Sequence, residues 1–144
     1  MNGRYKFGKN ERLANRKHIS CLFESGYSFN VNLLKVHDQV TRYPEKPEIK
    51  IIIALPKRKF KRAFDRNHIR RLIKEAYRLN KSILTGRFTG FPVMLHIGFT
   101  YTGDNIKIPF AEVEKQMKLG LEKLGRILLQ NMPADISPPD GPAT

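Results

Sequence analysis

The side chains in this sequence that could do chemistry are mostly cations, and they are concentrated in one segment. Residues 57–78 contain ten basic and two acidic side chains, in a chain of 144 residues with a net charge of +14. Arginine binds phosphate oxygens in a bidentate manner, and lysine adds a point charge. Where charged residues serve solubility alone, basic and acidic side chains are interspersed over the whole surface. The concentration therefore predicts a polyanionic partner such as a nucleic acid.

The sequence contains no pattern that predicts catalysis by the protein itself. Its acidic residues are scattered, and His18, His37, His68 and His96 lack the close spacing of a metal site. No phosphate-binding glycine motif is present. Cys21 is the single cysteine, which excludes an internal disulfide and fits a reducing compartment. We therefore predict no catalytic residue and no metal ligand in the protein.

The location of the protein is predicted from its apolar runs. None approaches the roughly 20 residues of a membrane-spanning helix. The first residues carry charge without the apolar stretch of a secretory signal. We expect a cytoplasmic protein that has no membrane partner.

The hydrophobic pattern predicts a small α/β sandwich around the basic segment. Apolar residues at helical spacing predict helices over residues 16–25, 64–80 and 110–128. Apolar runs with strand-like alternation or many β-branched residues predict strands over residues 29–37, 49–55 and 93–101. The strand over 49–55 is apolar and β-branched, which is typical of a central strand buried on both faces. Residues 84–92, which contain two glycines, are predicted as a loop.

The domain organisation follows from composition. Residues 1–12 are polar and basic, and we expect a flexible basic arm there. Residues 13–130 are expected to form a single RNA-binding domain. Residues 131–144 contain four prolines and little to bury, so we predict a disordered Pro-rich tail.

The helix over 64–80 is strongly amphipathic, with a cationic face beside its apolar face. The loop Lys57–Arg62 brings five cations to the N-terminus of this helix, where the helix dipole already favours anions. The cationic face then continues for about four turns along the helix. Such a stripe fits a phosphate backbone better than a small acidic ligand.

The segment RNHIRRLIKEAYR, residues 66–78, resembles the bacterial ribonuclease P protein component. That family has an Arg-Asn-Arg-x-Lys/Arg-Arg block that opens a helix after a hydrophobic strand and a basic loop. Arg66, Asn67, Arg70 and Arg71 match this block. His68 stands where the family has its middle arginine, a difference that should weaken one contact at the edge of the cationic face without removing the surface.

The resemblance extends over about residues 12 to 129. The segment RLANRKHISCLFESG resembles the first helix of the family, with Phe23 and Gly26 in place and Ile19 where an aromatic residue is common. The implied fold is an α+β sandwich of order α-β-β-β-α-β-α with a left-handed βαβ crossover, ribosomal protein S5 domain 2-like. This hand is opposite to the usual rule.

The resemblance also implies a function. The chain would be the protein subunit of ribonuclease P, which binds the catalytic RNA and the 5′ leader of precursor tRNA and assists endonucleolytic removal of the leader. The RNA subunit with its Mg²⁺ would carry the catalysis, so the protein would be an accessory subunit that binds no cofactor alone. Its partners would be ribonuclease P RNA, in a 1:1 complex, and precursor tRNA.

Two groups of site residues are implied. The expected RNA-binding residues are Arg58, Lys59, Lys61, Arg62, Arg66, Asn67, His68, Arg70, Arg71, Lys74 and Arg78. The expected leader cleft contains Phe23, Ile19, Lys35 and His37. An aromatic ring there would stack on an unpaired base, although Phe23 would equally suit plain core packing.

One alternative function uses the same cationic stripe. A ribosomal or RNA-chaperone protein would bind structured RNA without any associated cleavage. Charge and periodicity do not separate the two functions, and only the motif at residues 66–71 favours the first.

Overall fold

The structure is a computed structural model that describes residues 11–42, 48–88 and 93–131. Its elements are α1 (Arg16–Ser25), β1 (Tyr27–Val31), β2 (Leu34–Arg42), β3 (Glu48–Ala54), α2 (Ala63–Asn80), α3 (Ser82–Phe88), β4 (Val93–Tyr101) and α4 (Phe110–Asn131). The predicted α+β order is confirmed, with the short helix α3 as an addition. None of the described helices is both long and apolar enough to cross a membrane.

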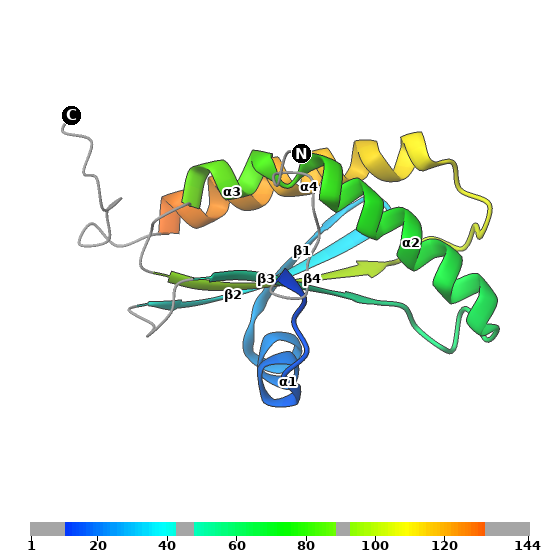
Figure 1. Ribbon diagram of the computed structural model, residues 1–144, viewed down its shortest axis with the longest axis horizontal. Helices are drawn as coiled ribbons and strands as arrows, with labels where there is room; N and C mark the ends of the chain where they lie inside the picture. Colours follow the sequence, from blue (N-terminus) through cyan, green and yellow to red (C-terminus); the bar gives the residue numbers. More distant parts are fainter. Residues whose placement is uncertain (1–10, 43–47, 89–92, 132–144) are drawn as a thin grey trace.

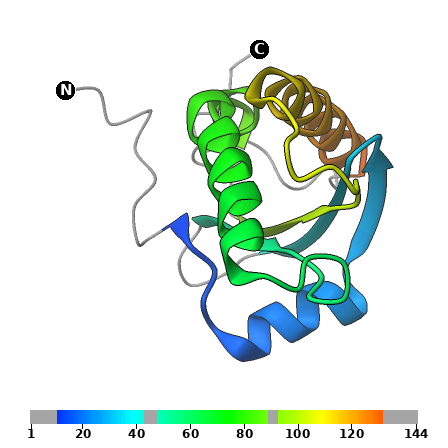
Figure 2. The ribbon, with the colours of Figure 1, turned by 90° about the vertical axis from the view of Figure 1, so that its right-hand side faces the viewer.

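The four strands form one sheet in the order β1-β2-β4-β3. β2 pairs antiparallel with β1 and β4, whereas β3 pairs parallel with β4. Figures 1 and 2 show α2, α3 and α4 together on one side of this sheet and α1 on the other. The parallel strands β3 and β4 are connected through α2 and α3, which is the βαβ unit of the implied fold.

The two faces of the sheet differ because successive residues of a strand point to opposite sides. Val36, Ile97 and Phe99 are fully buried in the core under α2 and α4, and the Tyr77 ring of α2 lies 5.9 Å from that of Phe99. The residues between them on the strands face α1. These are Lys35, His37 and Gln39 on β2 and His96, Gly98 and Thr100 on β4. One face is therefore an apolar core, and the other is mostly polar.

The strand predicted over residues 29–37 is a hairpin. β1 and β2 are paired from Tyr27 with Asp38 to Val31 with Leu34, so only two residues form the turn between them. Asn32 takes the left-handed backbone conformation there, with φ of 42°. Asparagine tolerates this conformation better than most residues other than glycine. The turn carries no glycine or proline, which is why the sequence pattern did not show it.

The prediction of a central strand over 49–55 is wrong, because β3 is at an edge of the sheet and β4 is central. The free edge of β3 is partly covered by the N-terminal segment. Arg12 forms an isolated parallel bridge with Ile51, and the Leu13 N–H donates to the Ile51 carbonyl at 2.8 Å. Leu13 is itself buried. This cover explains an apolar sequence at an edge position.

The segment predicted as a loop over 84–92 begins as helix α3, while residues 89–92 lie outside the described part. Of the predicted N-terminal arm, residues 1–10 also lie outside it, as do residues 132–144 of the predicted tail. Glu11 lies against the domain, with its carboxylate 2.7 Å from the buried Lys81 ammonium group.

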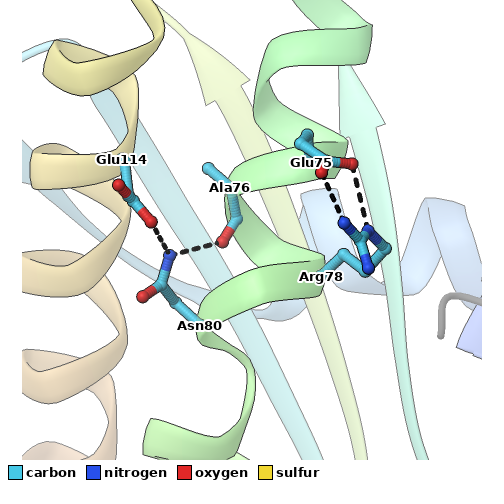
Figure 3. A network of polar contacts seen from close by, with 5 residues as sticks. All are labelled: Glu75, Ala76, Arg78, Asn80 and Glu114. Atoms are coloured by element: carbon cyan, nitrogen blue, oxygen red, sulfur yellow. Dashed lines mark hydrogen bonds and ion pairs between the residues drawn. The ribbon is translucent and has the colours of Figure 1, made fainter. Parts of the chain in front are cut away.

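Helix α2 is fixed to α4 at its C-terminal end. The Asn80 amide donates to the Ala76 carbonyl at 2.8 Å and to the Glu114 carboxylate of α4 at 3.0 Å (Figure 3). Ile69, Ile73 and Ala76 on α2 are fully buried in the core. The opposite side of α2 is thereby held outward.

Candidate nucleic-acid interface

The loop between β3 and α2 is anchored by an aromatic residue and a lysine. Phe60 is buried, and its ring is stacked on that of Tyr101 at 5.8 Å. The Lys59 ammonium group donates to the Thr102 carbonyl at 2.6 Å and lies 3.1 Å from the Asp104 carboxylate. Lys59, which the sequence placed among the RNA-binding cations, therefore helps to hold the loop against the end of β4.

Arg66 braces the same loop from the first turns of α2. Its Nη1 donates to the carbonyls of Phe60 at 2.6 Å and Lys61 at 3.0 Å. A guanidinium group has five N–H donors in a planar fork. Nε and Nη2 of Arg66 have no partner within the described residues. The side chain can thus fix the loop and still present donors to a phosphate.

Further along α2, two arginines are engaged by neighbours on the helix. Arg70 donates to the Asn67 amide oxygen at 2.9 Å. Arg78 forms a bidentate pair with Glu75, with its Nε 3.0 Å from one carboxylate oxygen and its Nη2 2.5 Å from the other (Figure 3). The hydrogen bond from Arg78 lowers the pKa of Glu75, which keeps the carboxylate ionised at neutral pH. Arg78 is therefore partly neutralised.

Four cations of this region are exposed and available to a polyanion. Lys57, Arg58, Lys61 and Arg71 are exposed and form no ion pair in the part of the chain that the structure describes. Arg62 is exposed and lies 4.0 Å from Asp65. We call the loop 57–62 and the outward residues of α2 the basic surface; on α2 these are Arg66, Asn67, His68, Arg70, Arg71, Lys74 and Arg78. One loop and one helix face bring all eleven predicted RNA-binding residues together.

The second predicted group lies on the opposite side of the sheet, where α1 packs. Leu22 is fully buried against the sheet, and Phe23 is 36% exposed with its ring edge-on to that of His37 at 4.6 Å. Gly98 permits this close approach. A Cβ there would lie 3.0 Å from Cζ of Phe23 and 3.2 Å from Cδ2 of Leu22.

The other residues of this group lie on the same side of the sheet as Phe23. Ile19 is one helical turn before it, on the same side of α1. His37 Nε2 and the Thr100 hydroxyl are 3.3 Å apart, and Lys35 follows the same face of β2. Burial, and then the Lys35 ammonium group, lower the pKa of His37, so that its ring is neutral at pH 7. We call Ile19, Phe23, Lys35 and His37 the α1 face.

Two features near the α1 face are not apparent from the sequence. A cavity of about 820 Å³ opens where α1 ends, lined in part by Gly26, Tyr27, Asp38 and Ile127. Burial raises the pKa of Asp38 to about 6. Asp38 lies on the core face of the sheet because of the register of the β1–β2 hairpin. The sequence pattern did not show this hairpin, so it could not predict that Asp38 is buried.

The second feature is a pair of histidines. The rings of His18 and His96 lie 4.9 Å apart. His96 Nε2 is buried, makes no hydrogen bond to the described residues, and lies 4.0 Å from the Glu48 carboxylate. Burial, and then His18, lower the pKa of His96. Because the two histidines are far apart in sequence, only the fold shows that they meet.

Comparison with known proteins identifies relatives for almost the whole domain. The model of the Ribonuclease P family matches residues 7–125. The ribonuclease P protein component of Porphyromonas gingivalis is 30% identical over 120 residues, which cover 83% of this chain and 87% of that protein. The corresponding protein of Chlorobium phaeobacteroides is 32% identical over 116 residues, covering 75% of this chain and 80% of that one.

Solved structures show the same fold. The RNase P protein of Thermotoga maritima superposes with a TM-score of 0.60 at 22% identity, covering 78% of this chain and 96% of that one. That of Staphylococcus aureus superposes with a TM-score of 0.61 at 16% identity, covering 83% and 98%. The matched residues 7–125 include the basic surface and the α1 face. The chain belongs to the ribonuclease P protein component family.

Proposed function

We propose that this protein binds the catalytic RNA of ribonuclease P through its basic surface and the 5′ leader of precursor tRNA through its α1 face. The observation that carries this proposal is the arrangement of the cations. Four of them are exposed and unpaired in the described chain, while Arg66 and Lys59 hold the loop that carries three of the four. Free cations on a loop that is already fixed suit a run of phosphates, because little backbone entropy of the loop is lost on binding.

The α1 face suits a single strand. The partly exposed ring of Phe23 provides a surface for an unpaired base. The neutral imidazole of His37 has a donor and an acceptor nitrogen, which suits a base edge or a 2′-hydroxyl group. Lys35 adds one positive charge for the strand's phosphates. Because α1 and α2 lie on opposite sides of the sheet (Figure 1), the two ligands would not compete.

In this proposal the protein contributes binding and orientation to the removal of the leader. The catalytic RNA carries the cleavage chemistry, with Mg²⁺ held by that RNA. Neutralisation of phosphates by the basic surface lowers the repulsion between two RNAs in one complex. The benefit of the protein should therefore be largest when Mg²⁺ is scarce.

The test is reconstitution with a bacterial ribonuclease P RNA at low Mg²⁺ concentration. Wild-type protein should accelerate removal of the leader from precursor tRNA over the RNA alone. Arg71→Ala should require about tenfold more protein for the same rate, because a charged contact contributes roughly 1.5 kcal/mol. Arg126→Ala is the matched control, since Arg126 is exposed on α4 outside the basic surface.

Two results would count against the proposal. Tight RNA binding with no acceleration of cleavage is the result expected of a ribosomal or RNA-chaperone protein. Equal effects of Arg71→Ala and Arg126→Ala would show that net charge matters and that the basic surface does not.

A further inference from the structure

Phe64 is a large apolar side chain that the fold leaves in water. It is 75% exposed in the first turn of α2. The other exposed large apolar residues of the described chain are Phe23, Tyr27, Leu119 and Leu129, which lie on α1, β1 and α4. Among these, Phe64 alone is placed within the basic surface.

Local structure does not explain a phenyl ring at this position. The helix begins at Ala63, and its N-cap residue Arg62 makes no side-chain capping hydrogen bond. Phenylalanine is a weaker helix former than alanine by about half a kcal/mol. The buried residues of α2 begin only at Ile69, on the other side of the helix. The ring therefore supports neither the core nor the helix end.

The neighbours of Phe64 are polar and cationic. Asn67 and His68 follow it by three and four residues, and Arg71 by seven, so all three lie along its side of the helix. Lys61 and Arg62 precede it in the loop. An exposed aromatic ring beside lysine and arginine side chains is the arrangement found where proteins bind unpaired nucleotides.

The chemistry of RNA limits what this ring can contact. Phosphates bound by the surrounding cations offer no apolar surface, and the bases of a duplex are already stacked on one another. The face of an unpaired base is the large apolar surface that remains. An exposed aromatic at the centre of a polar interface also matches the composition of binding hot spots.

We propose that Phe64 stacks on an unpaired base in the RNA that occupies the basic surface. The surface then recognises a looped or bulged nucleotide beside a run of phosphates, and it discriminates against uniform duplex. This inference rests on the proposed function, because it takes the RNA subunit as the ligand of the basic surface.

The experiment measures the affinity of a bacterial ribonuclease P RNA for the whole protein. Phe64→Ala should weaken binding about 5- to 100-fold, the range found for loss of one stacked base. The slope of log K against log salt should not change, because no charge is lost. Leu119→Ala, which removes an exposed apolar residue from α4, should bind like the wild type. Thermal unfolding of both variants should match the wild type.

Two further variants separate stacking from simple apolar contact. Phe64→Leu keeps an apolar side chain but should retain only part of the affinity. Phe64→Trp should bind at least as tightly as the wild type. The chain contains no tryptophan, so the fluorescence of this variant reports on the site alone and should be quenched when RNA binds.

Each contrary result has a distinct meaning. Wild-type affinity in Phe64→Ala or Phe64→Leu, or unchanged fluorescence of Phe64→Trp in the complex, overturns the stacking proposal and leaves the proposed function standing. A wild-type protein that does not bind ribonuclease P RNA overturns the proposed function itself.

Discussion

Arg71 and Arg78 are the same residue type on the same side of α2, two turns apart, yet the structure gives them different roles. Arg71 is exposed without an ion pair in the described chain, whereas Arg78 is paired with Glu75. Replacing each with alanine should therefore affect RNA binding unequally. The quantity that separates them is the salt dependence of the binding constant.

The expected magnitudes follow from counterion release. Each neutralised phosphate contributes about 0.7 to 0.9 to the slope of log K against log salt. About five phosphate contacts give a wild-type slope of about −3.5 to −4.5. Arg71→Ala should make this slope shallower by about 0.7 to 0.9. Arg78→Ala should change it by less than half as much, because Arg78 must leave an ionised carboxylate before it can bind a phosphate.

A third variant tests the cause. Glu75→Gln keeps the shape of the side chain and removes its charge, so this carboxylate no longer competes with a phosphate for Arg78 and the slope should steepen. In that background, Arg78→Ala should have the full effect of Arg71→Ala. Filter binding or fluorescence titration at five salt concentrations would measure the slopes of the wild type and the four variants. Equal changes for Arg71→Ala and Arg78→Ala in the native background would refute the reasoning.

Three further predictions concern the scaffold. Burial raises the pKa of Asp38 from 3.8 to about 6. The folded protein therefore binds the carboxyl proton more tightly than the unfolded chain does, and the free energy of unfolding declines as the pH rises between these two values. In denaturant titrations, Asp38→Asn should raise the free energy of unfolding by about 2–3 kcal/mol at pH 7.5 and by almost nothing at pH 3.5; an equal gain at both pH values contradicts the assignment. Gly26→Ala should lower the free energy of unfolding by about 3 kcal/mol. The new Cβ would clash with the backbone oxygen of Leu22 and would lie 2.6 Å from that of Asp38; a wild-type melting temperature rejects this prediction. Arg66→Ala should weaken RNA binding more than Arg71→Ala does, because it also releases the loop carbonyls; equal losses would show that the brace is unimportant.

The sequence predicted the elements whose signals are local. The helices over 64–80 and 110–128 have long runs of apolar residues at helical spacing, and both are present as α2 and α4. The apolar runs over 49–55 and 93–101 are present as β3 and β4. The alternation of apolar residues predicts a single strand over 29–37 where the structure has β1 and β2. Only the family resemblance implied three strands before α2.

Features that depend on tertiary structure were not predictable. The turn at Asn32 has no glycine or proline to mark it, so the hairpin was hidden. The apolar run of β3 is explained by Leu13 on its edge, which only the fold shows. The sequence located the cations of the basic surface, but their availability depends on distant partners such as Asp104, which holds Lys59.

The central claim is that the α1 face binds the leader while the basic surface binds the catalytic RNA. The most direct measurement is the ratio of affinities of the reconstituted complex for precursor tRNA and for mature tRNA, compared with the same ratio for the RNA alone. The wild-type protein should raise this ratio, and Phe23→Ala should return it most of the way to the value of the RNA alone. The loss of thermal stability should be smaller than for a fully buried phenylalanine, because the ring is partly exposed. Arg71→Ala, measured at saturating protein, should leave the raised ratio intact. A ratio that Phe23→Ala leaves unchanged, or that falls only as the protein loses stability, would contradict the account.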